Sequence, residues 1–177
     1  MKEISSVQKA CGFYISNMHF ATMILPFVNK QLEENTKITT FFENDFTINI
    51  ELVLSKLKIT EERKRELLDV NWKNKNILKY LTTEKILKNS LDKKRNNLIL
   101  INGRDNYINN INDAIDKYMQ KNMKKFKNLK IMDFYEVGNF NENVTEILDK
   151  HELLFNTAGE HKIEEIFEGY KRVEVNI

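Results

Sequence analysis

The chain has 177 residues, of which 41% are hydrophobic and 31% are charged. This length fits one domain, and the composition is too apolar for a disordered chain and too charged for a membrane protein. The net charge is only +2, with both signs interspersed, which argues against direct contact with nucleic acid. We therefore expect a single folded domain over residues 1–177.

Helical and strand patterns alternate from the start of the chain. Residues 10–14 form an apolar and aromatic run that predicts a strand, and residues 18–32 repeat apolar positions at threes and fours, which predicts an amphipathic helix. Pro26 lies inside this helix, so a kink or a break is expected there. A second strand is predicted at residues 37–42, with a helix over about residues 48–57 after it.

The middle of the chain continues this alternation. Residues 67–70 predict a short third strand, and residues 77–94 form a helical pattern that could be split at Thr82 and Thr83, which are good cap residues. Residues 97–102 contain four consecutive apolar residues between asparagines, which is typical of a strand buried on both faces. We expect this strand to be the central one.

The last part of the chain completes the pattern. It contains a long helix over about residues 107–126, a strand at 129–135, a helix that opens at Asn141, a short strand at 153–155 and one or two helical turns at 163–170. Such alternation predicts an α/β fold with three layers, in which helices flank a mostly parallel central sheet.

Common catalytic motifs are absent from the sequence. Gly103 alone follows the strand at 97–102, so there is neither a phosphate loop nor a three-glycine dinucleotide motif. The single cysteine, Cys11, and the three histidines, at 19, 151 and 161, lack the spacing of a zinc site. Cys11 is expected to be buried and inert. We therefore expect no catalytic residue, no metal and no cofactor.

The N-terminus and the cysteine content both favour the cytoplasm. Residues 1–9 have no apolar core of the kind found in a secretory signal. Cys11 can form no internal disulfide, which agrees with a reducing compartment. We therefore expect a cytoplasmic protein without a membrane span.

A basic run within residues 117–130 has two interpretations. Its lysines could contact an acidic partner, or they could complement the dipole at the end of a helix and keep the surface soluble. The run includes Lys121, Lys124, Lys125 and Lys127.

Three pairs of adjacent aromatic residues fall in predicted strands. Adjacent residues of a strand point to opposite faces of the sheet, so one member of each pair should be in the core. The other could line a groove at the strand ends, although core filling on both faces is the simpler account. The pairs are Phe13 with Tyr14, Phe41 with Phe42, and Phe134 with Tyr135.

Three stretches carry a resemblance to a known family. Lys-Ala-Cys-Gly-Phe-Tyr at 9–14 is similar to an opening strand His-x-Cys-x-Phe-Tyr, with Lys9 in place of the histidine. Phe-Val-Asn-Lys-Gln-Leu at 27–32 is similar to Phe-x-x-x-Gly-Leu, with glutamine in place of the glycine. Ile-Met-Asp-Phe-Tyr at 131–135 leads through Phe140 and Ile147 to His151, as the closing strand and helix of the family lead to a histidine.

Over about residues 8–160 the chain thus resembles the MEDS domain. This is a sensory domain of methanogens and methylotrophs, present in the repressor of dichloromethane degradation and fused to histidine kinases. The resemblance implies a RecA-like fold without the phosphate loop, with residues 161–177 as a C-terminal helical extension.

We therefore expect a non-catalytic sensory module that binds a small molecule or a partner protein and regulates a histidine kinase or a transcription factor. Each candidate for the binding groove lies at or just past the end of a predicted strand or helix. These candidates are Tyr14, Glu43, Arg104, Tyr135 and His151. Two alternatives stay open: a degenerate nucleotide-binding ATPase or transferase, and a protein-interaction regulator that has no ligand.

Overall fold

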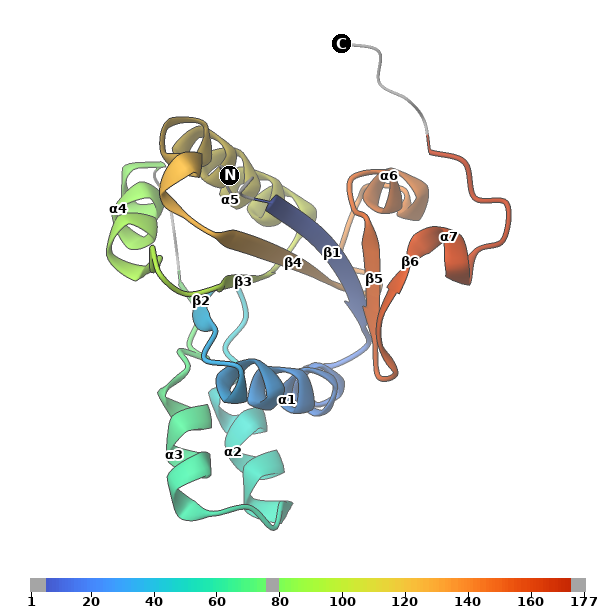
Figure 1. The fold of residues 1–177 in the computed structure, drawn as a ribbon. Helices are drawn as coiled ribbons and strands as arrows, with labels where there is room; N and C mark the ends of the chain where they lie inside the picture. Colours follow the sequence, from blue (N-terminus) through green and yellow to red (C-terminus); the bar gives the residue numbers. More distant parts are fainter. Residues whose placement is uncertain (1–5, 76–79, 173–177) are drawn as a thin grey trace.

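A computed structural model describes residues 6–75 and 80–172 and contains one six-stranded sheet (Figure 1). The strand order is β2-β3-β4-β1-β5-β6, and every neighbouring pair is parallel except β5 and β6, which form an antiparallel hairpin. The strands are β1 (Ser6–Tyr14), β2 (Lys37–Phe42), β3 (Asn97–Asn102), β4 (Asn128–Glu136), β5 (Leu153–Asn156) and β6 (Gly159–Lys162).

Helices cover both faces of this sheet. On one face, α1 crosses from β1 to β2, and α2 and α3 pack beside it as an arm that extends away from the sheet (Figure 1). On the other face lie α4, α5 and α6. The helices are α1 (Asn17–Glu33), α2 (Thr47–Lys56), α3 (Glu61–Asp69), α4 (Tyr80–Ser90), α5 (Asp105–Asn122), α6 (Val144–Asp149) and α7 (Ile163–Ile166), with a short 3₁₀ turn, η1 (Met123–Lys125), after α5. The predicted three-layer α/β fold with a mostly parallel sheet is confirmed.

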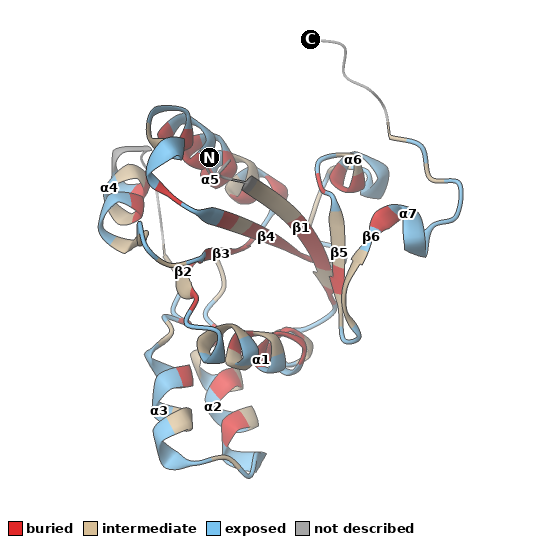
Figure 2. Ribbon diagram, viewed as in Figure 1, coloured by how far each residue is buried: buried red, intermediate tan, exposed pale blue. Residues whose placement is uncertain are grey.

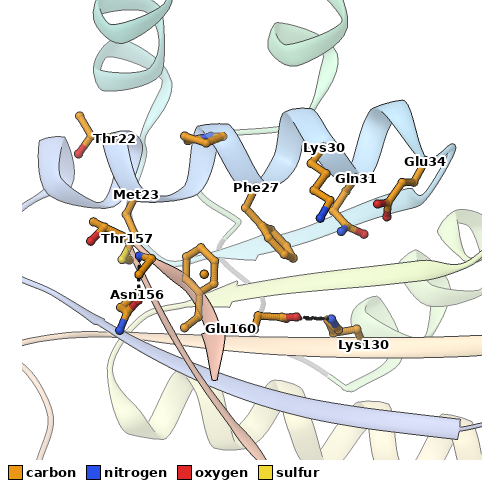
Figure 3. Close-up of a pocket in the computed structure, with 14 residues that line it drawn as sticks. Thr22, Met23, Phe27, Lys30, Gln31, Glu34, Lys130, Asn156, Thr157 and Glu160 are labelled. Carbon is orange, nitrogen blue, oxygen red and sulfur yellow. Dashed lines mark hydrogen bonds and ion pairs between the residues drawn. The ribbon is translucent and has the colours of Figure 1, made fainter. Parts of the chain in front are cut away.

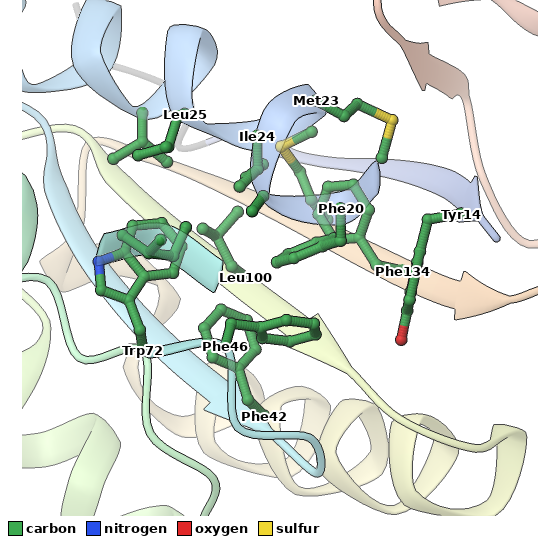
Figure 4. Packing of buried hydrophobic residues seen from close by; sticks show 14 of the residues in the cluster. Tyr14, Phe20, Met23, Ile24, Leu25, Phe42, Phe46, Trp72, Leu100 and Phe134 are labelled. Atoms are coloured by element: carbon green, nitrogen blue, oxygen red, sulfur yellow. The ribbon is translucent and has the colours of Figure 1, made fainter. Parts of the chain in front are cut away.

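An aromatic core lies between α1 and the sheet (Figure 4). The ring of Phe20 is central, with its centroid 4.2 Å from that of Phe46 and 5.0 Å from that of Phe134. Gly12 of β1 makes room for this packing, because a Cβ atom there would lie 2.8 Å from the Phe134 ring. Close packing of large rings therefore fixes how α1 lies on the sheet.

The opposite core is mostly aliphatic and is supplied by β3, β4 and α5. All six residues of β3 are buried, as expected for a strand covered on both faces (Figure 2). From α5, Ile108, Ile111 and Ile115 form one buried stripe at helical spacing. Both members of the Phe41 with Phe42 pair are buried, and they belong to opposite cores.

Most predicted elements are present, but several expectations were wrong. Residues 67–70 are not a strand: α3 reaches Asp69, and its first turn is capped by Thr60, whose side chain accepts a hydrogen bond from the backbone of Arg63 at 3.2 Å. The helix α1 continues through Pro26, so of the kink or break expected there the break does not occur. β3 is internal, but β4 and β1 form the middle of the sheet.

Smaller differences concern element ends. α4 runs from Tyr80 without a break at Thr82, and residues 77–79 of the helix predicted there lie outside the described residues. α6 begins after Asn143, which forms a capping box with Glu146, rather than at Asn141. Within the described residues, no helix has both the length and the apolar character needed to cross a membrane.

Candidate functional site

Two of the predicted site residues form an ion pair at the carboxyl end of the sheet. Glu43 follows β2 and Arg104 follows β3, and the Nε of Arg104 donates to Glu43 Oε1 at 3.0 Å. The backbone N–H of Arg104 donates to the same oxygen at 3.2 Å. Gly103 allows this approach, since a Cβ there would lie 2.9 Å from Glu43 Cβ. Because the Arg104 side chain is 73% exposed, solvent screens the pair and its contribution to stability is small.

Tyr14, at the end of β1, lies beside this pair but is fully buried. Its hydroxyl accepts hydrogen bonds from Asn44 Nδ2, at 3.1 Å, and from Asn102 Nδ2, which also donates to the carbonyl of Phe134 at 3.3 Å. Burial raises the pKa of Tyr14 to about 12, so the hydroxyl stays protonated. Tyr14 thus ties together the ends of several strands.

The other two predicted residues, Tyr135 and His151, lie on the opposite face of the sheet, where His151 pairs with Asp133. His151 Nε2 lies 2.7 Å from Asp133 Oδ2, and His151 Nδ1 lies 2.6 Å from the carbonyl oxygen of Ile147. The two ring nitrogens of His151 thus bridge the side chain of Asp133 and the backbone carbonyl of Ile147. Tyr135 packs edge-on against the His151 ring.

A third side chain completes this buried network. Asn112 Nδ2 donates to both carboxylate oxygens of Asp133, at 3.0 and 3.1 Å, and to the carbonyl of Ile108 at 3.1 Å. Asp133 and His151 are each only 1% exposed. The network is thus closed to solvent and holds α5 and α6 to β4.

Cys11 is also buried, as predicted, and lies in β1 opposite Asp133 of β4. Burial, together with the nearby carboxylate of Asp133, raises the pKa of the Cys11 thiol to about 12. A thiol of this kind is not a nucleophile at neutral pH. Among the residues that the structure describes, there is no group of three or more His, Cys, Asp or Glu side chains placed to hold a metal ion.

A groove of about 630 Å³ lies between α1 and the β5–β6 hairpin (Figure 3). The groove exists because α1 connects β1 to β2 and so covers the sheet on that side of β1. The strands β5 and β6 lie on the other side of β1, where α1 does not cover them fully. One wall comes from the outward side of α1 and the other from the turn between β5 and β6. The residues that shape it most are Met23, Phe27, Lys30, Lys130, Phe155 and Glu160.

An ion pair and two aromatic rings form the inner part of the groove. Lys130 Nζ lies 2.7 Å from Glu160 Oε2, and both side chains are only about a quarter exposed (25% and 22%). The ring centroid of Phe27 lies 5.1 Å from that of Phe155, and Lys130 Nζ lies 6.0 Å from the centroid of Phe27. The groove therefore offers one positive group, one negative group and an aromatic surface side by side.

The structure divides the predicted site residues into two groups. Tyr14, Glu43 and Arg104 meet at the carboxyl end of the sheet, whereas Tyr135 and His151 lie together on the α5 face. None of the five lines the groove. The groove residues were missed, although Phe27 and Lys30 belong to the 27–32 stretch that carried the family resemblance.

Comparison of the chain with protein-family models, with curated proteins and with solved structures gives no match. The fold and the groove therefore define the class of protein only as a three-layer α/β domain with a hollow beside its sheet. The resemblance to the MEDS domain stays a prediction.

Proposed function

We propose that this chain is a cytoplasmic, non-catalytic sensory domain that binds a small molecule in the groove between α1 and the β5–β6 hairpin. The groove itself carries the proposal. Its volume of about 630 Å³ is typical of small-molecule sites, which combine an apolar lining with a few placed polar groups. Phe27 and Phe155 supply the apolar surface, and Lys130 and Glu160 supply the polar groups.

The paired charges favour a ligand that itself carries both signs. An ammonium has three donors and a carboxylate accepts several hydrogen bonds, so Lys130 and Glu160 keep bonding capacity beyond the bond between them. A small zwitterion could place its carboxylate at Lys130 and its ammonium at Glu160, with an apolar group on the ring of Phe27. Lys30 of α1 and Glu34, the C-cap residue of that helix, add one further charge of each sign to the lining.

The position of the groove suggests how binding could produce a signal. Among the described residues, β5 pairs with β1 only from Ala10 to Gly12, and β6 is an edge strand that pairs only with β5. A ligand that contacts both walls would hold the hairpin to α1, and α7 follows β6 directly. Because elements with few contacts open most easily, the hairpin is suited to a shift in population on binding. A histidine kinase or a transcription factor would read that shift.

A titration followed at the Met23 methyl group tests this proposal. Met23 lines the groove, whereas Met119 lies buried in the opposite core and serves as an internal control. 3-Phenylpropionate, L-phenylalanine and phenethylamine share a phenylethyl skeleton and carry a carboxylate alone, both charged groups, and an ammonium alone, respectively. We expect L-phenylalanine to shift the Met23 resonance most, and Met119 to stay unchanged.

Matched lysine variants make the test specific. Lys130→Gln should weaken L-phenylalanine binding about tenfold, because a charge-assisted hydrogen bond is lost. Lys127→Gln, just before β4 and outside the groove, should leave binding unchanged. A Met23 resonance that none of the three compounds shifts would contradict the proposed site. Stabilisation by ATP with magnesium that depends on Arg104 would favour the degenerate ATPase instead.

A further inference from the structure

A second hollow, of about 420 Å³, lies between the end of α4 and the end of α5. Three lysines line it, Lys88 from α4, Lys93 from the loop after it and Lys125 from η1. We propose that this hollow binds a phosphate monoester carried on an aromatic group. The proposal concerns a different site from the groove and does not depend on the sensory function.

The charges around this hollow are unbalanced. Within residues 6–75 and 80–172, no carboxylate forms an ion pair with any of the three lysines. Lys125 Nζ donates to the neutral amide oxygen of Asn122 at 2.8 Å. Asp92, which is next to Lys93 in the chain, accepts from the backbone N–H groups of its own loop instead. Of the described residues, Glu84 is the one carboxylate in the lining, so three positive charges face one negative charge.

The inner surface of the hollow is aromatic. Tyr118 and Phe126 are each only 7% exposed, and their ring centroids lie 6.4 Å apart. No described residue hydrogen-bonds to the Tyr118 hydroxyl. Burial and the nearby Glu84 raise the pKa of Tyr118, so this hydroxyl keeps its proton and can donate to an anion. A ligand with a flat apolar group could therefore lie on the rings while its anion meets the lysines.

The number of lysines favours a phosphate monoester over a carboxylate. At neutral pH a phosphate monoester carries a charge of about −1.5 to −2 and presents three acceptor oxygens, whereas a carboxylate carries one charge. Lysine binds phosphate as a point charge from many directions, which suits side chains that approach from three separate segments. The basic run identified in the sequence thus contributes Lys125 to a defined hollow, and not only to the dipole at the end of α5.

Calorimetric titration with phenyl phosphate tests this site. We expect phenyl phosphate to bind at least about tenfold more tightly than inorganic phosphate, because only the former can pack on Tyr118 and Phe126. Lys88→Gln and Lys125→Gln should each weaken its binding about tenfold. Added salt should weaken it further, since the lysines are exposed. These surface substitutions should leave the fold intact.

A lysine far from the hollow provides the control. Lys58, in the exposed loop between α2 and α3, should be replaceable by glutamine without a change in affinity. Equal losses in Lys58→Gln and Lys88→Gln would show attraction by net charge alone and would overturn the proposal. Equal affinities for phenyl phosphate and inorganic phosphate, or no binding of phenyl phosphate at all, would overturn it too. The Met23 methyl resonance should not respond to phenyl phosphate, which keeps this result separate from the groove.

Discussion

Replacing His151 by leucine should destabilise the protein strongly. The His151 ring is hydrogen-bonded to Asp133 at 2.7 Å and to the carbonyl of Ile147 at 2.6 Å, and leucine can form neither bond. In the variant, the Asp133 carboxylate stays 1% exposed and keeps only the amide of Asn112. Removing one partner of a buried pair costs about 3–5 kcal/mol, which is a large part of the roughly 5–15 kcal/mol that stabilises a domain.

Replacing Asp133 and His151 together should lower the free energy of unfolding by less than the sum of the two single replacements. In Asp133→Leu/His151→Leu neither member of the pair is left without the other. The remaining loss of stability comes from neutral groups that lose a partner, such as the amide of Asn112. We therefore expect the loss of unfolding free energy in the double variant to be smaller than the sum of the two single losses by at least about 1 kcal/mol. Such non-additivity is the direct signature of the pair.

Urea unfolding followed by far-ultraviolet circular dichroism measures these free energies of unfolding. His161→Leu provides the matched control, because His161 lies on the edge strand β6 and is only partly buried. It should change stability by no more than about 0.5 kcal/mol. A loss of under about 1 kcal/mol for His151→Leu would refute the importance of this buried, hydrogen-bonded pair for stability.

Three further predictions follow from buried groups near β1. Gly12→Ala should lower the free energy of unfolding by about 1–3 kcal/mol, because the Cβ of the alanine would lie 2.8 Å from the Phe134 ring. An unchanged midpoint of urea unfolding would argue against this packing. Cys11 should not react with a thiol reagent at about pH 8 in the folded protein, because burial raises the pKa of its thiol to about 12. It should react once the protein is unfolded in urea. Rapid reaction without urea would show that the thiol is accessible to solvent. Burial also raises the pKa of Tyr14 from 10.0 to about 12, so the folded state keeps a proton that the unfolded chain loses, and stability should fall as the pH rises from about 10 to 12. Tyr14→Phe should show a shallower fall over that range, and an identical slope would contradict the assignment.

The apolar strands were predictable because their runs are short, buried and bounded by polar residues. Residues 37–42 and 97–102 are strands with the predicted bounds. The prediction of a strand at residues 67–70 was wrong because an apolar run this short shows neither strand nor helix periodicity. Residues 67–69 belong to the helix that begins after the N-cap Thr60. β6 has no apolar run at all; it is a strand because its backbone pairs with β5.

The candidate sites depend on which strands become neighbours, and a single sequence does not contain that information. Glu43 and Arg104 were predictable because parallel strands end at one edge of the sheet. Tyr135 was assigned to the same edge, but its side chain points to the α5 face, together with that of Asp133 two residues earlier. Lys130 of β4 and Glu160 of β6 are 30 residues apart in the sequence, and β1 and β5 lie between their strands in the sheet, so their side-chain contact across two strands could not be predicted.

Hydrogen exchange with and without L-phenylalanine tests the proposed sensory role most directly. If the ligand holds the β5–β6 hairpin to α1, the backbone amides of β5, β6 and the turn between them should exchange more slowly when it is bound. Those of α3, on the arm away from the groove, should not change. Unchanged exchange in the hairpin at saturating ligand, or an equal slowing throughout the chain, would contradict the account.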